Sequence, residues 1–250
     1  MRVVSLVPSL TLTLFDLGLT ANEVVGRTAW CIHPSEEIGG VPVMGGTKTP
    51  TLSKILHARP DLVVMDRDEN PKAVHDWCIE NGLTTFVCHV QHPRDVPEML
   101  RELGQAVNRK ARAHQFAEAL EHHLQLLEHR PPLEMTVAPL IWHDPLMVAD
   151  AHTYAGGMLS CLGFDVAKIE PEGNGYPAVT PEVLIQHGVD GLLMSSEPYN
   201  FSLEEGQALA RAMSEDGRTP PWVKCIDGEA LTWMGSATMR GLEKLERRLL

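Results

Sequence analysis

Residues 105–130 read QAVNRKARAHQFAEALEHHLQLLEHR and contain neither proline nor glycine, whereas Pro131 and Pro132 follow at once. Apolar residues recur in this stretch at intervals of three and four: Ala113, Phe116, Ala117, Leu120, Leu124 and Leu127. The spacing predicts a helix with one apolar stripe, roughly 35–40 Å long at about 1.5 Å per residue. Such a helix can join two globular parts, or it can be one more surface helix of a single α/β domain.

Short β-branched runs alternate with helical patterns on both sides of this helix, which is typical of an α/β protein. Strands are expected near 2–7, 23–28, 62–65 and 85–88, and again near 136–141, 164–169, 191–194 and 223–227. The sequences on the two sides of this helix also share a pattern. TLSKILHARPDLVV (51–64) and TPEVLIQHGVDGLL (180–193) each read as a capped short helix, an aspartate and a buried strand.

We therefore expect two similar α/β lobes, residues 1–104 and residues 131–250, joined by one long backbone helix over 105–130. A ligand cleft between the lobes would be lined by loops at the carboxyl ends of strands, because loops present side chains that strands and helices hold in place.

The 250 residues carry a formal charge of −12, and no stripe of the chain is basic. Neutralising phosphate groups needs clustered Lys and Arg, so we expect neither a nucleic-acid partner nor attraction to an anionic membrane. The five cysteines are odd in number and form no CxxC pair. This favours reduced thiols, most of them buried.

The N-terminal stretch MRVVSLVPSLTLTLFDLGLT is interrupted by Pro8 and Asp16, and no small-residue cleavage site follows it. A signal peptide is therefore not expected. No apolar run reaches the length of a membrane span, so we expect no membrane insertion. The sequence as it stands predicts a cytoplasmic protein, and a periplasmic one if a leader has been removed.

Aromatic residues gather at the predicted loops although they make up only 5% of the chain. The loop aromatics are Trp30, Trp142, Tyr176, Tyr199, Phe201, Trp222 and Trp233. Aromatic walls suit a large, flat or apolar ligand. The alternative is that these rings simply cap the core at the ends of strands.

Histidines at the loops permit a second interpretation. His33 and His143 lie after predicted strands, and neutral imidazole is a good ligand for a transition metal or for a bound metal complex. No HExxH or CxxC motif supports a dedicated site, and twelve histidines produce near-pairs by chance. The helix histidines, His114, His122, His123 and His129, are expected to be solvated.

The usual enzyme motifs GxGxxG, GxSxG and GxxxxGK[ST] do not occur. Asp66, Asp68 and Glu69 follow a buried strand and could be general acids or metal ligands, but a polar loop that caps the next helix is the favoured explanation. We therefore expect no catalytic residues and no required cofactor. A cytosolic enzyme or a sensor that reuses the cleft is the alternative.

Several segments together resemble a known family. They are VVSLVPS (3–9), the stretch from GGT (45–47) to ARPDLVV (58–64), the long helix, IWHDPLMVA (141–149), TYAGGMLSCLG (153–163), YPAVTPE (176–182), SSEPYNF (195–201) and DGEALTWMGS (227–236). In this order they resemble the class III, helical-backbone, substrate-binding proteins of ABC importers, of the cobalamin-, haem- and siderophore-binding type. The resemblance implies two Rossmann-like lobes joined by one helix, with the ligand held in the cleft.

Carried over by position, the resemblance implies seven ligand-facing residues: Trp30, His33, Thr47, Trp142, Tyr176, Tyr199 and Trp233. It implies a corrinoid such as cobalamin as the first choice of ligand, with haem or a siderophore next. A free transition metal ion bound through His and Cys is the alternative. The ligand is expected to be a small molecule, and any metal to be held through His33 or His143.

The resemblance also implies a partner. Family members present one acidic residue per lobe to an ABC permease, on helices matched here by 51–57 and 180–186. Glu182 fits the second position, whereas Ser53 occupies the first. The missing charge weakens the expected docking on a permease, because charge complementarity guides such encounters.

Overall fold

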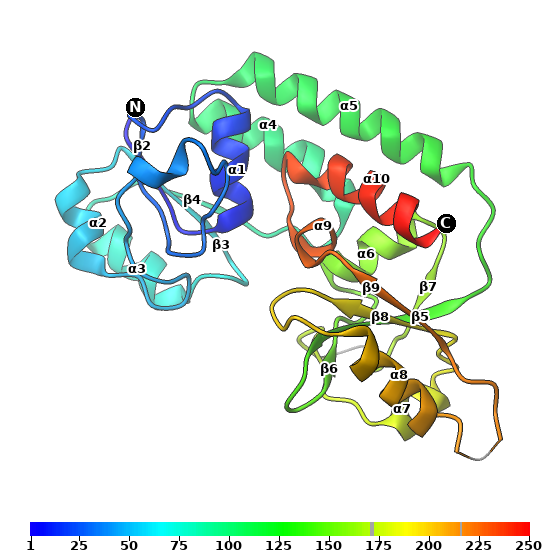
Figure 1. The fold of residues 1–250 in the computed structure, drawn as a ribbon. Helices are drawn as coiled ribbons and strands as arrows, with labels where there is room; N and C mark the ends of the chain where they lie inside the picture. Colours follow the sequence, from blue (N-terminus) through cyan, green and yellow to red (C-terminus); the bar gives the residue numbers. More distant parts are fainter. Residues whose placement is uncertain (171–172, 216) are drawn as a thin grey trace. The chain divides into compact units, whose positions relative to one another are not determined.

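The computed structural model describes residues 1–170, 173–215 and 217–250, and within them the chain forms two compact units (Figure 1). Unit 1 comprises Met1–Val90, Val96–Leu120 and Met234–Ala237, and unit 2 comprises Gln91–Asp95, Glu121–Trp233 and Thr238–Leu250. The described strands form two sheets, one in each unit. The predicted α/β class with two lobes is thus confirmed, and a single continuous sheet is excluded for the part of the chain described.

Unit 1 contains a parallel sheet in the order β2-β1-β3-β4. Its strands are β1 (Val3–Ser5), β2 (Val24–Gly26), β3 (Leu62–Asp66) and β4 (Thr85–Cys88). Its helices are α1 (Pro8–Asp16), the 3-10 helix η1 (Ile38–Gly40), α2 (Leu52–Ala58), α3 (Lys72–Glu80) and α4 (Val96–Ala106). Every residue of β3 is buried, which explains its unbroken apolar run, since a central parallel strand is covered on both faces.

Unit 2 contains a sheet in the order β6-β5-β8-β9, with β7 also paired to β5. Its strands are β5 (Thr136–Trp142), β6 (Met147–Val148), β7 (Asp165–Val166), β8 (Gly191–Ser195) and β9 (Trp222–Ile226). Only β6 pairs in the antiparallel sense among these described strands. Its helices are η2 (Pro93–Asp95), α6 (Tyr154–Cys161), α7 (Pro181–Gln186), α8 (Leu203–Ala212), α9 (Gly228–Thr232) and α10 (Ala237–Leu249).

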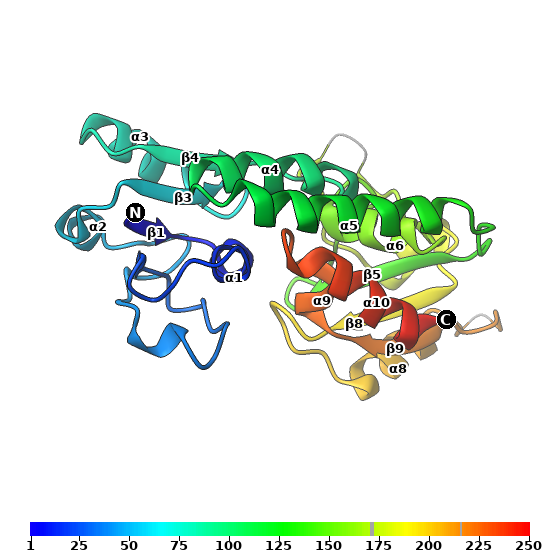
Figure 2. The ribbon, with the colours of Figure 1, turned by 90° about the horizontal axis from the view of Figure 1, so that it is seen from above.

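The helix that the sequence predicts over 105–130 is α5 (Lys110–Glu128), which runs without interruption in both views (Figures 1 and 2). The boundary between the units falls within it, between Leu120 and Glu121. The apolar stripe is confirmed, because Ala113, Ala117, Leu120, Leu124 and Leu127 are all buried. The lobe boundaries expected at 104 and 131 stay predictions.

The helix begins later than the expected Gln105, because α4 continues to Ala106 and a turn separates the two helices. Asn108 adopts a left-handed φ of 56°, and the N–H of Arg109 donates to the carbonyl of Gly104 at 2.7 Å. This pairing is a common way to end a helix. A Cβ on Gly104 would lie 2.2 Å from Cβ of Ala113, so the glycine is what allows α4 and α5 to touch here.

The α5 histidines follow the expectation with one exception. His114, His122 and His129 are exposed. His123 is half-buried, and its Nε2 is buried without a hydrogen-bond partner. The expectation that all four are solvated is therefore wrong for His123, because the apolar stripe turns this position partly toward the interior.

Candidate functional site

The most aromatic loops of unit 2 meet at one edge of its sheet. Because β5, β8 and β9 are parallel neighbours, their carboxyl ends lie on the same side. Trp142 is the last residue of β5, and the backbone N–H of Tyr199, in the loop after β8, donates to the carbonyl of Ile141 at 3.2 Å. This bond draws the two loops together and brings their side chains into contact.

Four side chains form what we call the aromatic cluster: Trp142, His143, Tyr199 and Phe201. The His143 imidazole stacks on the Tyr199 ring, with centroids 5.1 Å apart and planes at 15°. Trp142 and Phe201 approach Tyr199 edge-on, with centroids 6.4 and 4.7 Å away. Offset stacking and edge contacts are the favourable geometries for such rings.

The aromatic cluster is buried at its base and exposed at its top. Phe201 is 5% exposed and belongs to the core of unit 2, whereas Trp142 is 42% exposed. The Nε1 of Trp142 donates to the carbonyl of Asp144 at 3.0 Å, which fixes the ring orientation. The cluster therefore offers a rigid aromatic face to solvent, which can pack against a flat ligand.

Glu205, in the first turn of α8, anchors the aromatic cluster. The Tyr199 hydroxyl donates to its Oε1 at 2.9 Å, and His143 Nδ1 lies 3.7 Å from the same oxygen. The N–H and hydroxyl of Ser202 both donate to Oε2 at 2.7 Å, which completes a capping box. The bond from the Ser202 backbone, then that from its side chain, lowers the pKa of Glu205.

The Tyr199 hydroxyl is correspondingly held in its neutral form. Its pKa is raised, chiefly because ionising it would break the hydrogen bond to the Glu205 carboxylate. The sequence analysis did not single out Glu205, although the Ser202-x-x-Glu205 spacing is a capping-box signal that could have found it.

Tyr176 and Trp233, the other two residues of unit 2 that were expected to face the ligand, differ in their exposure to solvent. Tyr176 is 38% exposed, as an accessible ring should be. Trp233 is only 9% exposed and ends α9, and its carbonyl accepts the Tyr154 hydroxyl at 3.4 Å. The indole of Trp233 thus presents little surface for a ligand.

In unit 1, Trp30 lies in the loop after β2 and is 66% exposed. A Cβ on Gly46 would lie 3.7 Å from the Trp30 Nε1, so the indole rests beside the loop that carries Thr47. Thr47 and His33 are both half-buried, and the carbonyl of Thr47 accepts the Asn70 amide at 3.0 Å. The structure thus brings the loops of Trp30 and Thr47 together, whereas a ligand-facing role for these residues and for His33 stays a prediction.

A buried polar network lies under the Trp30 loop. Thr11 Oγ1 donates to Ser5 Oγ at 2.8 Å and lies 3.1 Å from Cys31 Sγ, and Thr28 Oγ1 is also 3.1 Å from that sulfur. All four side chains are fully buried. The network ties the loop to β1 and α1, a role that the sequence pattern did not reveal.

Asp66 is the last residue of β3, and its side chain binds the loop that follows. Its Oδ1 accepts the backbone N–H groups of Asp68 and Glu69 at 2.9 and 3.0 Å, and Cys88 Sγ lies 3.4 Å from Oδ2. Burial raises the pKa of Asp66, and burial also raises that of Cys88. Since both carboxylate oxygens have partners within the loop, the arrangement is that of a loop anchor.

The described residues contain no group of three or more His, Cys, Asp and Glu side chains arranged to hold a metal ion. His33 belongs to unit 1, and His143 to unit 2. Glu205 lies 3.7 Å from His143 Nδ1, but its carboxylate already accepts hydrogen bonds from Tyr199 and Ser202. Metal binding through either histidine stays a prediction.

The residues expected to face a partner lie on short helices. Glu182, in the first turn of α7, is exposed, and its pKa is lowered, first by a hydrogen bond with the Thr180 side chain. Ser53 is exposed on α2. Both are available at the surface of their units, one as an anion and one as a neutral hydroxyl.

Comparison with known proteins places the chain in a family. The profile of the family described as "Periplasmic binding protein" matches residues 3–214. The chain belongs to this family, and the resemblance drawn from the sequence is confirmed. No helix among the described residues combines the length and apolarity that a membrane span needs.

Particular relatives refine the comparison. The chain is 26% identical over 164 residues to the vitamin B12-binding protein of Yersinia pestis (strain Pestoides F), and the match covers 65% of this chain and 58% of that relative. It therefore spans less than two thirds of the relative's length.

Two solved structures share the fold. One is the periplasmic vitamin B12-binding protein BtuF of Vibrio cholerae, with a TM-score of 0.79 and 17% identity, over 99% of this chain and 96% of that one. The other is the periplasmic heme-binding protein RhuT from Roseiflexus sp. RS-1 in apo form, with a TM-score of 0.78 and 22% identity, over 99% and 97%.

Proposed function

We propose that this protein is a non-catalytic binding protein for a corrinoid, with cobalamin as the first choice. The observation that carries the proposal is the aromatic cluster, in which Tyr199 contacts Trp142, His143 and Phe201 at the carboxyl edge of the sheet in unit 2. A corrin ring offers a broad flat face, which such a surface can cover. The vitamin B12-binding relative supports a corrinoid over other flat ligands.

The remaining expected residues receive roles within this proposal. Trp30 is the most exposed tryptophan of unit 1 and would supply a second aromatic contact. His143 would present an imidazole to the metal of the ligand, and its ring is held by stacking on Tyr199, with Nδ1 3.7 Å from Oε1 of Glu205. Ligand capture of this kind needs no resident cofactor.

The test is a titration of the purified chain with cyanocobalamin, haemin and a ferric siderophore, followed by absorbance and calorimetry. Zinc chloride serves as the free-metal arm. We expect cyanocobalamin to bind at micromolar concentration or below, which corresponds to about −8 kcal/mol or better. Failure of cyanocobalamin to bind, or tighter binding of any other arm, would overturn the corrinoid assignment.

Trp142→Ala measures the contribution of the aromatic cluster. If the ligand covers the 42% of this side chain that is exposed, it buries roughly 100 Å², worth at most about 2.6 kcal/mol or roughly 80-fold in affinity. Leu126→Ala is the matched control, because Leu126 is 56% exposed but lies on α5 outside the loops. A loss below about twofold, or an equal loss in both variants, would remove the cluster from the site.

A permease partner and a periplasmic location belong to the same proposal. Glu182 would supply the charged contact, so Glu182→Lys should abolish stimulation of a cognate ABC permease without changing ligand affinity, and Ser53→Glu should strengthen the interaction. Cell fractionation checks the location, and recovery of the protein only from cytoplasm would contradict it.

A further inference from the structure

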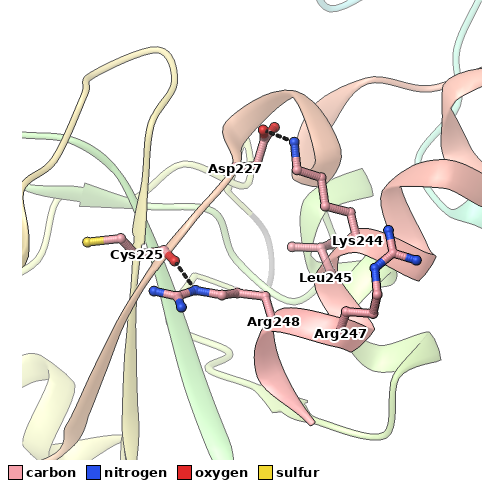
Figure 3. Close-up of a pocket in the computed structure, with 6 residues that line it drawn as sticks. All are labelled: Cys225, Asp227, Lys244, Leu245, Arg247 and Arg248. Atoms are coloured by element: carbon pink, nitrogen blue, oxygen red, sulfur yellow. Dashed lines mark hydrogen bonds and ion pairs between the residues drawn. The ribbon is translucent and has the colours of Figure 1, made fainter.

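A cavity of about 380 Å³ in unit 2 lies between the end of β9 and the last turns of α10 (Figure 3). Its polar groups bind one another. Lys244 pairs with Asp227, and Nε of Arg248 donates to the carbonyl of Cys225 at 2.9 Å. Figure 3 shows Arg247 and Arg248 leaving the helix in different directions. These contacts attach α10 to the end of β9, and the charged groups do not converge on a ligand.

In unit 1, Trp30 lies near the tip of a tight turn whose two ends are buried. The N–H of Cys31 donates to the carbonyl of Thr28 at 3.2 Å, which closes a turn over residues 28–31 with Trp30 as its third residue. Trp30 is 66% exposed, whereas Thr28 and Cys31 are both fully buried. The turn therefore presents an indole to solvent on two anchored ends.

The Cys31 thiol joins these ends to the elements beneath them. Its Sγ lies 3.1 Å from the hydroxyl of Thr28 and 3.1 Å from that of Thr11, in α1. The Thr11 hydroxyl in turn donates to Oγ of Ser5, the last residue of β1, at 2.8 Å. Because a thiol can both donate and accept a hydrogen bond, a single sulfur can link both threonines.

The turn has a second attachment, to the loop that carries Thr47. The N–H of Ala29 donates to the carbonyl of Gly45 at 2.9 Å, and a Cβ on Gly46 would lie 3.7 Å from Nε1 of Trp30. Backbone and ring are thus both restricted in the free protein. Such restriction lowers the entropy that is lost when a ligand orders a side chain.

A purely structural role is the alternative explanation for Cys31, because free cysteines often fill a core as small apolar residues. Cys78 is a cysteine of that kind in the same unit. It is also fully buried and belongs to a hydrophobic core cluster, and its thiol has no hydrogen-bond partner among the described residues. The two cysteines therefore differ in their polar contacts and not in their burial.

We propose that Cys31 is a positioning residue for ligand binding, which locks the turn of residues 28–31 and so holds the Trp30 indole ready for a flat ligand. The inference rests on the proposed function, in which Trp30 contacts a corrinoid. Cys31 is fully buried and does not touch the ligand. It acts only through Trp30.

The test is Cys31→Ala, with calorimetry of cyanocobalamin binding as the measurement. We expect the affinity to fall about three- to tenfold, because a mobile indole must be ordered when the ligand binds. Cys78→Ala is the matched control, since it removes the same atom from a fully buried position of the same unit. It should lower the urea midpoint of unfolding and leave the affinity at the wild-type value.

A double-variant cycle separates positioning from a general loss of stability. Trp30→Ala removes the group through which Cys31 acts, so adding Cys31→Ala to it should change the affinity by less than about twofold. Cys31→Ser, whose hydroxyl can also pair with both threonines, should bind more tightly than Cys31→Ala. The proposal would be overturned by wild-type affinity in Cys31→Ala, by equal losses in Cys31→Ala and Cys78→Ala, by additive losses in the cycle, or by no recovery in Cys31→Ser.

Hydrogen exchange without ligand keeps this proposal distinct from the corrinoid assignment. The amide of Ala29, which bonds to Gly45, should exchange about fivefold faster or more in Cys31→Ala and at the wild-type rate in Cys78→Ala. Unchanged exchange in Cys31→Ala would overturn the lock. Faster exchange in a chain that fails to bind cyanocobalamin would support the lock and overturn the corrinoid assignment alone.

Discussion

Asp150 is the residue whose removal tests the structure of unit 2 most directly. Its side chain is fully buried, and its carboxylate accepts the backbone N–H groups of Ala151, Ile169 and Glu170 at 2.5, 2.7 and 2.9 Å. His152 Nδ1 lies 3.3 Å from Oδ1. The carboxylate therefore connects the turn before α6 to the segment that follows β7.

The cost of Asp150→Ala follows from these contacts. A hydrogen bond to a charged acceptor contributes about 1.5–3 kcal/mol, so three of them set an upper limit of roughly 4.5–9 kcal/mol. The donors are only partly buried, and water can replace part of what is lost. We expect a loss of about 3–5 kcal/mol, which is large against a typical total of about 5–15 kcal/mol. Asp150→Asn keeps one acceptor oxygen and should cost less.

Urea unfolding followed by circular dichroism measures the loss, and hydrogen exchange of the amides of Ile169 and Glu170 localises it. Asp165→Ala is the matched control, because Asp165 is an exposed aspartate of the same unit. A loss below about 1 kcal/mol, with unchanged exchange at Ile169, would refute the reasoning that these amides depend on the carboxylate.

Three further predictions concern single groups. The Ser202 bonds hold the pKa of Glu205 below 4.5, so the stabilising effect of the carboxylate is present above pH 4.5 and is lost as the pH falls through the lowered pKa. Glu205→Gln should therefore lower the free energy of unfolding at pH 7 by about 0.5–1 kcal/mol, and its urea midpoint should vary less with pH than that of the wild type between about pH 5 and 3. Parallel pH profiles for the two proteins would contradict this. Gly104→Ala should destabilise by about 1–3 kcal/mol in urea, because the new methyl would meet Ala113, whereas any stabilisation would show that the helices can separate. Burial raises the pKa of Cys161 to about 11, so iodoacetamide at pH 8 should label this thiol slowly in the native protein and quickly in urea. Mass spectrometry measures the labelling, and rapid labelling of the native protein would show that the thiol is accessible.

Local pattern predicted most of the secondary structure. The apolar run at 62–65 became β3, and the intervals of three and four became α5. Thr180 caps α7, as the Thr-Pro pair indicated. These features succeed because the residues that produce them are neighbours in the chain. The sequence did not predict β6 and α9, because elements of two and five residues are too short to show a periodicity.

The candidate site was predictable by residue type but not by arrangement. Loop position singled out Trp142 and Tyr199, and the structure places their rings 6.4 Å apart. Loop position also singled out Trp233, which is only 9% exposed. A single sequence does not distinguish a ring that faces solvent from one that closes the core, because both follow a strand.

By itself the sequence determined most of the strands and helices and their order, the apolar face of α5, the α/β class and the family. These depend on spacing along the chain. Tertiary structure alone decided that Glu205 holds Tyr199 and that Asp150 is buried with three N–H partners. Each of these arrangements depends on groups that come together only when the chain folds. The spacing of residues along the sequence does not show which partner a side chain will meet.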